Sequence, residues 1–367
     1  GDTLPAGGLS DPLKVSFSAK FNILRDEEFA EMFNQCWRGL ADFFYDPTLH
    51  DTNWAGVRAK YEPVLKHVSM KEDLYSLIHL MLGELNASHL GISGQLPPAN
   101  EYAADLGLLF DESFAGPGLK IAEVLRRGPA DRRGIKLAPG DIVLAIDRTP
   151  ITAKTNLPQL LLNKIGEGVF LDVPSDPKDA TATRRVEIIG ASRDRTMELM
   201  YDRWVAKNAE MVTKLSGGKL GYLHIPGMDE KGLEAFMRAL YSDNFDKDAI
   251  VIDVRYNGGG FTHDQVLNYL TGKEHTLFKM RNGGEGLVMR NYDRKWTKPL
   301  VVMINNRSYS DAEIFPHAFR TLGLGKLVGQ ATGGLVIGTF TTQLIDGSNF
   351  RLPRTGIYTV QGVNMEK

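Results

Sequence analysis

The sequence predicts an α/β chain with a helical lead-in and a β-rich middle module. Between residues 215 and 367, strand-like apolar runs alternate with amphipathic helical runs, as in KLGYLHIP, GLEAFMRALY and AIVIDVRY. Such alternation is typical of a mostly parallel sheet covered by helices. Residues 25–85 instead repeat apolar residues at helical spacing, and residues 102–173 form short strand-like runs separated by turn residues. A chain of 367 residues is long enough for two or three such domains.

Three domains are expected along the chain. Residues 1–100 are the helical lead-in, residues 101–200 the β-rich module and residues 201–367 the α/β domain. The first boundary is placed near residue 100, because the stretch ASHLGISGQLPPAN combines small residues, glycine and a proline pair. Ser88 and His89 stand in this stretch, at the end of the helical lead-in.

The composition excludes several classes of function. The 43 basic and 45 acidic residues give a net charge of -2, which argues against a broad surface for nucleic acid or membranes. The single Cys36 excludes an internal disulfide framework and is expected to be a buried structural thiol. No uncharged apolar run approaches the roughly 18 residues of a membrane span. No His, Cys, Asp and Glu cluster has metal-ligand spacing, so neither metal nor cofactor is expected.

The start of the chain bears on its location. It begins with Gly rather than Met, which indicates a trimmed or excised piece, and its opening segment has no apolar signal core. The cytoplasm is favoured, with a periplasmic or secreted location left open. A missing upstream domain is left open as well.

A glycine run after a predicted strand is the first chemical feature. The strand AIVIDVRY leads directly into Asn257, Gly258, Gly259 and Gly260, where the backbone can turn sharply and point N–H groups outward. Such groups suit an anion or an oxyanion. A tight glycine turn without a ligand is the alternative when the run is taken alone.

A serine at a strand–helix junction is the second feature. The strand PLVVMINN is followed by Ser310 and Asp311 and then by a predicted helix at residues 312–319. A helix N-terminus stabilises developing negative charge, although a serine before a helix is also an ordinary N-cap. A nucleophilic serine needs a neighbouring base, and that base needs a group to orient it.

The histidines supply one candidate for that base. Among the eight histidines, His224 in a strand and His317 in a helix are expected to be structural or packing residues. His89 instead follows a helix, in a run of small residues and directly after Ser88. Ser88 together with a carboxylate could orient the imidazole of His89.

Taken together, several segments resemble a known family. The segments that carry this resemblance are DVRYNGGG, SYSDAEIFPHAFRTLGLGKLVG, GQATGG, LIDG and LNASH. In order and spacing over residues 20–367, the chain resembles the catalytic region of tricorn-type serine peptidases, within the C-terminal processing peptidase superfamily. The resemblance implies a crotonase/ClpP-like α/β spiral. It also implies Ser310 as nucleophile, His89 as general base, and Ser88 and Glu366 as the rest of a tetrad.

The same resemblance implies an oxyanion hole and a peptide-binding module. The oxyanion hole would be the backbone N–H groups of Gly260 and Asp311. The middle module resembles a PDZ domain over the segment GLKIAEVLRRGPADRRGIKLAPGDIVLAIDRTPI. It would therefore bind peptide C-termini through the backbone of Leu106, Gly107, Leu108 and Leu109. A structural spacer with an occluded groove is equally open.

The chain departs from the family at three places. Leu335 occupies the position of the lysine in bacterial tail-specific peptidases, so the Ser/Lys mechanism is contradicted and the histidine version is supported. Phe278 stands where tricorn has an acid that favours basic residues before the cut, so an apolar preference is at least as well supported. The chain ends at Lys367, where the family continues, and a truncation there would leave Glu366 poorly anchored.

Two readings from other classes remain beside the peptidase. One is a catalytically silent protein that binds peptides through its PDZ-like module, and the other is a crotonase-like acyl enzyme. The expected partners are peptide or unfolded polypeptide substrates, with a homo-oligomer left open. If the peptidase assignment is correct, His89 should lie beside Ser310 in space.

Overall fold

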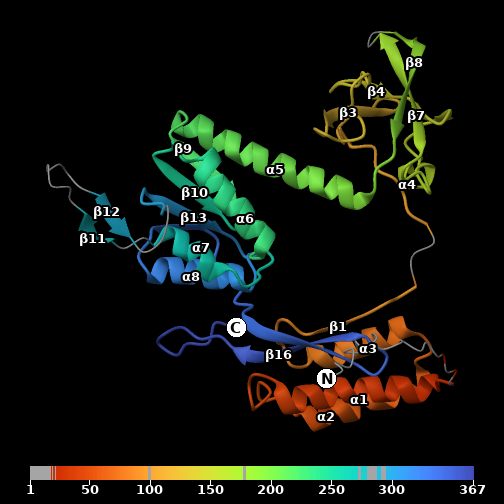
Figure 1. Cartoon of the computed structure of the whole chain (residues 1–367). Helices are drawn as coiled ribbons and strands as arrows, with labels where there is room; N and C mark the ends of the chain where they lie inside the picture. The colour runs from red at the N-terminus through yellow and green to blue at the C-terminus, as the bar shows by residue number, and fades with distance from the viewer. Residues whose placement is uncertain are drawn as a thin grey trace, which may run out of the picture. The chain divides into compact units, whose positions relative to one another are not determined.

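The computed structural model describes residues 18, 20, 22–97, 101–176, 179–271, 274–278, 287–290 and 295–367. The chain divides into two compact units. Unit 1 comprises Gly1–Leu96 with Ile337–Gly356, and unit 2 comprises Pro97–Val336 with Ile357–Lys367. Each unit therefore contains segments from distant parts of the sequence (Figure 1).

Unit 1 packs helices against a small antiparallel sheet. The strand order is β1-β16-β15, with α1 against β16 and α3 against β1 (Figure 1). The elements are α1 (Arg25–Phe43), α2 (Trp54–Tyr61), the 3₁₀ helix η1 (Glu62–His67), α3 (Lys71–Gly83), β1 (Gly91–Ser93), β15 (Ile337–Gln343) and β16 (Asn349–Gly356).

The core of unit 1 follows from the helical periodicity of the sequence. Apolar residues of α1 recur every three or four positions and share one buried face, which packs with Phe350 and Leu352 of β16. Cys36 lies on this face, and burial raises the pKa of its thiol, so the predicted structural thiol is confirmed. The buried residues of α1 are Phe29, Met32, Phe33, Cys36 and Leu40.

Unit 2 contains a four-stranded parallel sheet in the order β14-β13-β10-β9. Buried residues on its strands and on α6, α7 and α8 form one apolar core. The elements are α5 (Arg193–Ser216), β9 (Leu220–His224), α6 (Glu230–Arg238), the π-helical turn η2 (Ala239–Asp243), β10 (Ala249–Asp253), α7 (His263–Leu270), β11 (Glu274–Phe278), β12 (Leu287–Arg290), β13 (Leu300–Ile304), α8 (Asp311–Thr321) and β14 (Lys326–Gly329).

The β-rich module precedes this sheet within unit 2. It has a three-stranded sheet in the order β2-β3-β4 and a four-stranded sheet in the order β6-β5-β7-β8, which share one apolar core. The elements are β2 (Leu108–Phe110), β3 (Leu119–Val124), β4 (Ile142–Val143), β5 (Ala145–Ile146), β6 (Thr149–Pro150), α4 (Leu157–Leu160), β7 (Gly168–Asp176) and β8 (Asp179–Ile189).

The predicted fold class is confirmed at this level. The chain is mixed α/β, its last region carries the expected parallel sheet, and the middle module consists of short strands. The three-domain division at residues 100 and 200 stays a prediction. Among the residues that the structure describes, no helix is long and apolar enough to cross a membrane.

Candidate active site

Ser310 occupies a strained turn between β13 and α8. Its φ of 56° and ψ of -118° lie in the left-handed half of conformational space, which residues other than glycine rarely enter. The Ser310 side chain makes no capping hydrogen bond to α8. This observation weighs against an ordinary N-cap. A strained strand–helix turn is also the geometry that presents a nucleophilic serine in other hydrolases.

Hydrogen bonds from the neighbouring strand ends hold this turn in place. The Ser308 hydroxyl donates to the Val254 carbonyl at 2.9 Å, and the Tyr309 N–H donates to the Asn257 carbonyl at 3.0 Å. Both acceptor residues, Val254 and Asn257, follow β10, which pairs with β13 in the sheet. The pairing of β10 with β13 therefore sets the position of Ser310 beside the glycine run.

The glycines at 259 and 260 are needed for this close approach. Gly259 has a φ of 84°, and a Cβ there would lie 2.7 Å from the Ser310 Cβ and 3.1 Å from the Asp311 nitrogen. Gly260 has a φ of 151°, and a Cβ there would collide with the Met228 carbonyl. The Asn257–Gly260 loop and the serine turn are thus in direct contact.

Two backbone N–H groups near the serine turn are available to a ligand: that of Asp311, directly after Ser310, and that of Gly260, directly after the Gly259 that contacts Ser310. Met228 pairs with the chain on both sides of Gly260, since its N–H donates to the Gly259 carbonyl and its carbonyl accepts from the Phe261 N–H. The N–H groups of Gly260 and Asp311 donate to no protein acceptor among the described residues. Two backbone N–H groups without a protein acceptor, close to a serine, can donate hydrogen bonds to an oxyanion and stabilise it.

The Asp311 side chain forms an ion pair with His263. Its two carboxylate oxygens lie 2.5 Å from His263 Nδ1 and 3.1 Å from the His263 backbone nitrogen, at the start of α7. Asp311 is buried, and its carboxylate raises the pKa of His263 above the ordinary value. This pair connects α7 to α8 directly behind the serine.

Ser88 and His89 lie together in unit 1, at the turn between α3 and β1. Ser88 Oγ and His89 Nδ1 are 2.6 Å apart, and His89 has a left-handed φ of 64°. Only 5% of His89 is exposed. Burial, with a smaller effect from the positive charge of Arg351, lowers the pKa of His89 to about 4. The imidazole is therefore neutral at pH 7.

Glu366 is buried and anchored in unit 2. Its Oε2 accepts from the Val336 N–H at 2.6 Å, although the chain ends one residue later. A second buried acid, Glu313 of α8, accepts from the N–H groups of Gly334 and Leu335 at 2.6 and 2.9 Å. The two carboxylates together fix the loop that carries Leu335.

The predicted peptide-binding residues lie at the start of β2 and at the end of β11. Leu108 begins β2, the outer strand of the β2-β3-β4 sheet, and Leu106 and Gly107 directly precede it; the Gly107 N–H donates to Asp105 Oδ1 at 2.9 Å. Phe278 pairs with Leu287 across β11 and β12. The Phe278 side chain lies outside the described part of the structure.

The structure thus brings five of the predicted site residues together in two places. Ser310, Gly260 and Asp311 lie together in unit 2, and Ser88 and His89 lie together in unit 1. The pairing of serine with histidine, and the roles of all these residues, stay proposals. Among the described residues no group of three or more His, Cys, Asp or Glu side chains is arranged to hold a metal ion.

The sequence analysis missed His263 and Glu313. Nothing local distinguishes His263 from other histidines, because its partner Asp311 is 48 residues away. Glu313 follows Ser310 at the spacing of an S-x-x-E capping box, which suggests a local role. Its side chain bonds a distant loop instead, and only the tertiary structure reveals that.

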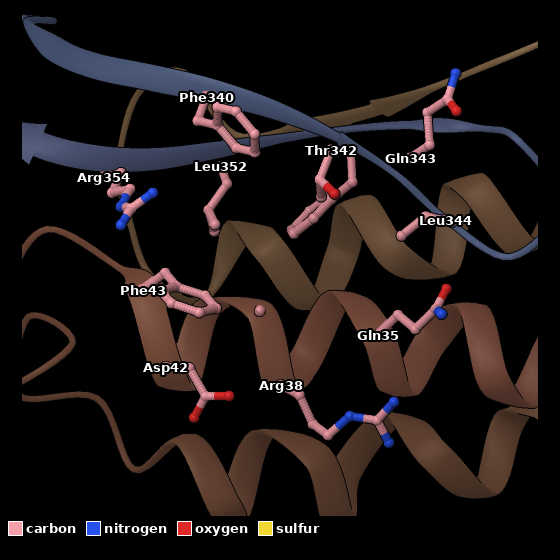
Figure 2. A pocket seen from close by; sticks show the side chains of 12 residues that line it. Gln35, Arg38, Asp42, Phe43, Phe340, Thr342, Gln343, Leu344, Leu352 and Arg354 are labelled. Carbon is pink, nitrogen blue, oxygen red and sulfur yellow. The ribbon is translucent and has the colours of Figure 1, made fainter.

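Unit 1 has a groove of its own, between α1 and the β15-β16 pair (Figure 2). Phe43, Phe340 and Leu352 contribute apolar walls, and the Arg354 guanidinium lies 5.4 Å from the Phe43 ring centre. None of the predicted site residues lines this groove. We therefore do not include it in the candidate active site.

The chain matches three protein families over successive segments. Residues 25–83 match the tricorn protease C1 domain, residues 81–167 the PDZ domain and residues 219–367 peptidase family S41. The order of the three segments is the order of the expected helical lead-in, β-rich module and α/β region.

Curated relatives and a solved structure agree with these matches. The chain is 30% identical over 96% of its length to a tricorn-like protease C-terminal subunit of Sulfurisphaera tokodaii, of which it covers 40%. It is 23% identical over 93% of its length to a carboxyl-terminal-processing protease of Synechocystis, of which it covers 79%. The crystal structure of the tricorn protease superposes on 92% of the chain with a TM-score of 0.74 and 25% identity, and the chain covers 33% of it.

The class of protein that the chain resembles in fold and sequence is the serine-type peptidase. Residues 219–367 match peptidase family S41, a segment matching the PDZ domain precedes them, and the chain as a whole is similar to the tricorn proteases. It spans well under half the length of the tricorn relatives that it matches. The activity of those whole proteins is therefore not transferred to it directly.

Proposed function

We propose that the chain hydrolyses peptides through an acyl-enzyme on Ser310, with His89 as the general base. The observation that carries this proposal is the conformation of Ser310, which is strained, does not cap α8 and lies against the glycine run, where the Gly260 and Asp311 N–H groups have no protein acceptor among the described residues. A serine in such a place gains nothing for the stability of the helix. Its strain is accounted for if its hydroxyl reacts.

His89 has the protonation state that a base requires. Its lowered pKa keeps it neutral at pH 7, and a neutral imidazole has one donor and one acceptor nitrogen. If Nδ1–H donates to Ser88 Oγ, Nε2 is the acceptor and can take the proton of the Ser310 hydroxyl. Ser88 then fixes the tautomer, and Glu366 completes the proposed tetrad.

The reaction would proceed in two halves. Ser310 Oγ attacks the scissile carbonyl while His89 accepts its proton, and the resulting oxyanion accepts hydrogen bonds from the Gly260 and Asp311 N–H groups. His89 then donates the proton to the leaving amine. A water molecule, deprotonated by His89, releases the acyl group in the second half. The N-terminus of α8 adds favourable electrostatics to both oxyanions.

The finer features of the family belong to the same proposal. We infer a crotonase/ClpP-like α/β spiral for the peptidase domain, peptide or unfolded polypeptide substrates, and a homo-oligomeric assembly. These inferences rest on the family matches and on the similarity to the tricorn protease. Phe278, in place of an acid, supports an apolar rather than a basic preference before the cut.

A fluorophosphonate probe tests the proposed class of activity, because only an activated serine reacts covalently with it. We expect one adduct per chain, located on Ser310 by peptide mapping. A silent peptide-binding protein would stay unlabelled in the folded state while still binding peptides. A crotonase-like acyl enzyme would instead turn over acyl thioesters without covalent labelling, and either result would contradict the proposal.

A further inference from the structure

Four aromatic rings form a pocket in unit 2, separate from the residues assigned so far. The pocket has a volume of about 340 Å³, at the small end of the roughly 300–1,000 Å³ range of ligand pockets. Most of its wall is apolar. We call it the aromatic pocket, and its lining residues are Tyr201, Trp204, His224, Pro226 and Tyr256.

The rings stand at steep angles to one another. Trp204 packs edge-on against His224, with centroids 4.9 Å apart, and edge-on against Tyr256, with centroids 5.8 Å apart. Tyr201 closes the group at 5.4 Å from His224. Because the rings are tilted, both ring faces and ring edges are exposed to the pocket. A further aromatic ring could therefore pack against them edge-to-face or offset-stacked, the geometries that aromatic pairs prefer.

The polar atoms of the His224 and Tyr201 side chains have hydrogen-bond partners in the protein. His224 Nε2 lies 2.9 Å from the Arg255 carbonyl, which can only accept, so this nitrogen carries the proton. In the neutral ring Nδ1 is then an acceptor, and the Tyr201 hydroxyl donates to it at 2.7 Å. Burial lowers the pKa of His224 and raises the pKa of Tyr201 to about 12, so both are uncharged at pH 7.

The charge around the pocket does not favour a cationic ligand. None of the described residues that line it is a carboxylate, and the Arg255 guanidinium already lies 5.1 Å from the Trp204 ring centre. The buried Asp253 is bound to Arg255 and to the Tyr222 hydroxyl, so its charge is compensated. An uncharged apolar or aromatic group fits this surrounding better than a lysine or arginine side chain.

Tyr256 places the pocket beside the proposed oxyanion loop. It directly precedes Asn257, has a left-handed φ of 62°, and is 58% exposed. Its N–H donates to Asn305 Oδ1 at 3.2 Å, in the segment that leads to Ser310. A non-glycine residue in this conformation with an exposed ring costs stability, and a role in binding would account for that cost.

We propose that the aromatic pocket receives an aromatic side chain of the peptide substrate, close to the bond that Ser310 attacks. This inference rests on the proposed function and names its substrate class. An extended peptide whose carbonyl lies at the Gly260 and Asp311 N–H groups passes the preceding loop residue Tyr256. One side chain of that peptide enters the pocket, and the walls select a ring over a charged group.

Peptide binding to the full chain carrying Ser310→Ala tests this without turnover. The probes are fluorescent peptides of one Gly/Ser/Ala sequence in which a single position, moved along the peptide, is Phe, Ala or Lys. At one position, the Phe peptide should bind about tenfold or more tightly than its Ala and Lys counterparts in fluorescence anisotropy. Tyr256→Asn, which tolerates the left-handed φ, should reduce this advantage to about threefold or less.

Two controls keep the result specific to the pocket. Tyr256→Phe retains the ring and should retain the advantage, and so should Phe245→Ala, which removes an exposed ring that does not line the pocket. Unchanged thermal unfolding verifies that each variant is folded. The proposal would be overturned by any of four results: equal affinity for the Phe and Ala peptides, higher affinity for the Lys peptide, no binding of any peptide, or a higher affinity for the Phe peptide that persists in Tyr256→Asn.

The proposed peptidase activity is judged by a different readout. If the fluorophosphonate leaves Ser310 of the native chain unlabelled, the proposed function fails even where the Phe preference is found. If Ser310 is labelled and the Phe preference is absent, only the pocket assignment fails.

Discussion

Three side chains that carry the proposals stand on left-handed backbone: His89 at φ 64°, Tyr256 at 62° and Ser310 at 56°. Such conformations cost about 1–3 kcal/mol each and persist only where the surroundings impose them. In each case the chain is leaving a strand or a helix, and the turn directs the side chain away from regular structure. The proposed roles of these three residues give a physical reason for their strain, which the packing of a helix or strand does not supply.

The lowered pKa of His89 predicts the pH dependence of activity. His89 accepts a proton only when neutral, so activity should fall as pH drops through about 4 and should not fall near 6.5, the value of a free histidine. The kcat/KM of peptide hydrolysis, measured from about pH 3.5 to about pH 10.5, gives this limb. A limb near 9 or above would instead indicate a lysine base.

The ion pair of His263 with Asp311 predicts a pH dependence of stability. The pKa of His263 is raised in the folded state, so the pair stabilises fully below about pH 6.5 and is lost as pH rises through the raised pKa. The free energy of unfolding should therefore decline with pH above 6.5. His263→Gln should remove this slope in denaturant titrations, whereas an unchanged slope would show that another group causes it.

At the scale of elements, the glycine run allows a comparison of two substitutions, because its glycines differ in the space around them. Gly258 has open space around it, whereas a Cβ on Gly259 would lie 2.6 Å from the Tyr309 carbonyl at a φ of 84°. Gly259→Ala should cost more than about 1 kcal/mol of stability and most of the activity. Gly258→Ala is the matched control and should be close to wild type in both. Similar effects of the two would mean that the loop is not packed against the serine turn.

The outer strand of the PDZ domain makes a second prediction at this scale. β2 has an open edge, which can accept an added strand, but the Gly107 N–H is already bonded to the Asp105 carboxylate. A peptide C-terminus would meet this negative charge. Amidation of the peptide should therefore change its affinity for the Ser310→Ala chain by less than about threefold.

Asp105→Asn provides the control for that experiment. An asparagine Oδ1 can keep the bond to Gly107 while removing the charge, so free C-termini should gain over amidated ones. Calorimetry or anisotropy measures the ratio of affinities. Should amidation weaken binding about tenfold in the unsubstituted module, the domain captures C-termini as the family resemblance implies.

At the scale of the whole molecule, the sequence predicted what depends on local pattern. Apolar periodicity located the helices of unit 1 and the strands of the parallel sheet, and the strand–turn–helix order located Ser310. The same pattern could not predict that β15 and β16 join unit 1. Their partner β1 precedes them by about 250 residues, and apolar alternation in a strand does not identify which strand it will pair with.

In the candidate site, too, the sequence indicated residues with an unusual local pattern and not those whose role depends on tertiary contacts. Asn257–Gly260 and Ser310 were found because each has an unusual local sequence. His263, Glu313 and the aromatic pocket were not, because their roles arise from partners brought together by the sheet. Tyr201 and Tyr256 are 55 residues apart and line one pocket only when α5 lies against the end of β9.

The central claim, that His89 activates Ser310, joins residues of the two units and is tested most directly by a double-mutant cycle on peptide hydrolysis. Ser310→Ala and His89→Ala should each reduce kcat/KM by about 10⁴-fold or more, and the double variant should lose little beyond either one, because the two side chains act as one unit. Additive losses, or a folded His89→Ala variant with near-normal activity, would contradict the claim.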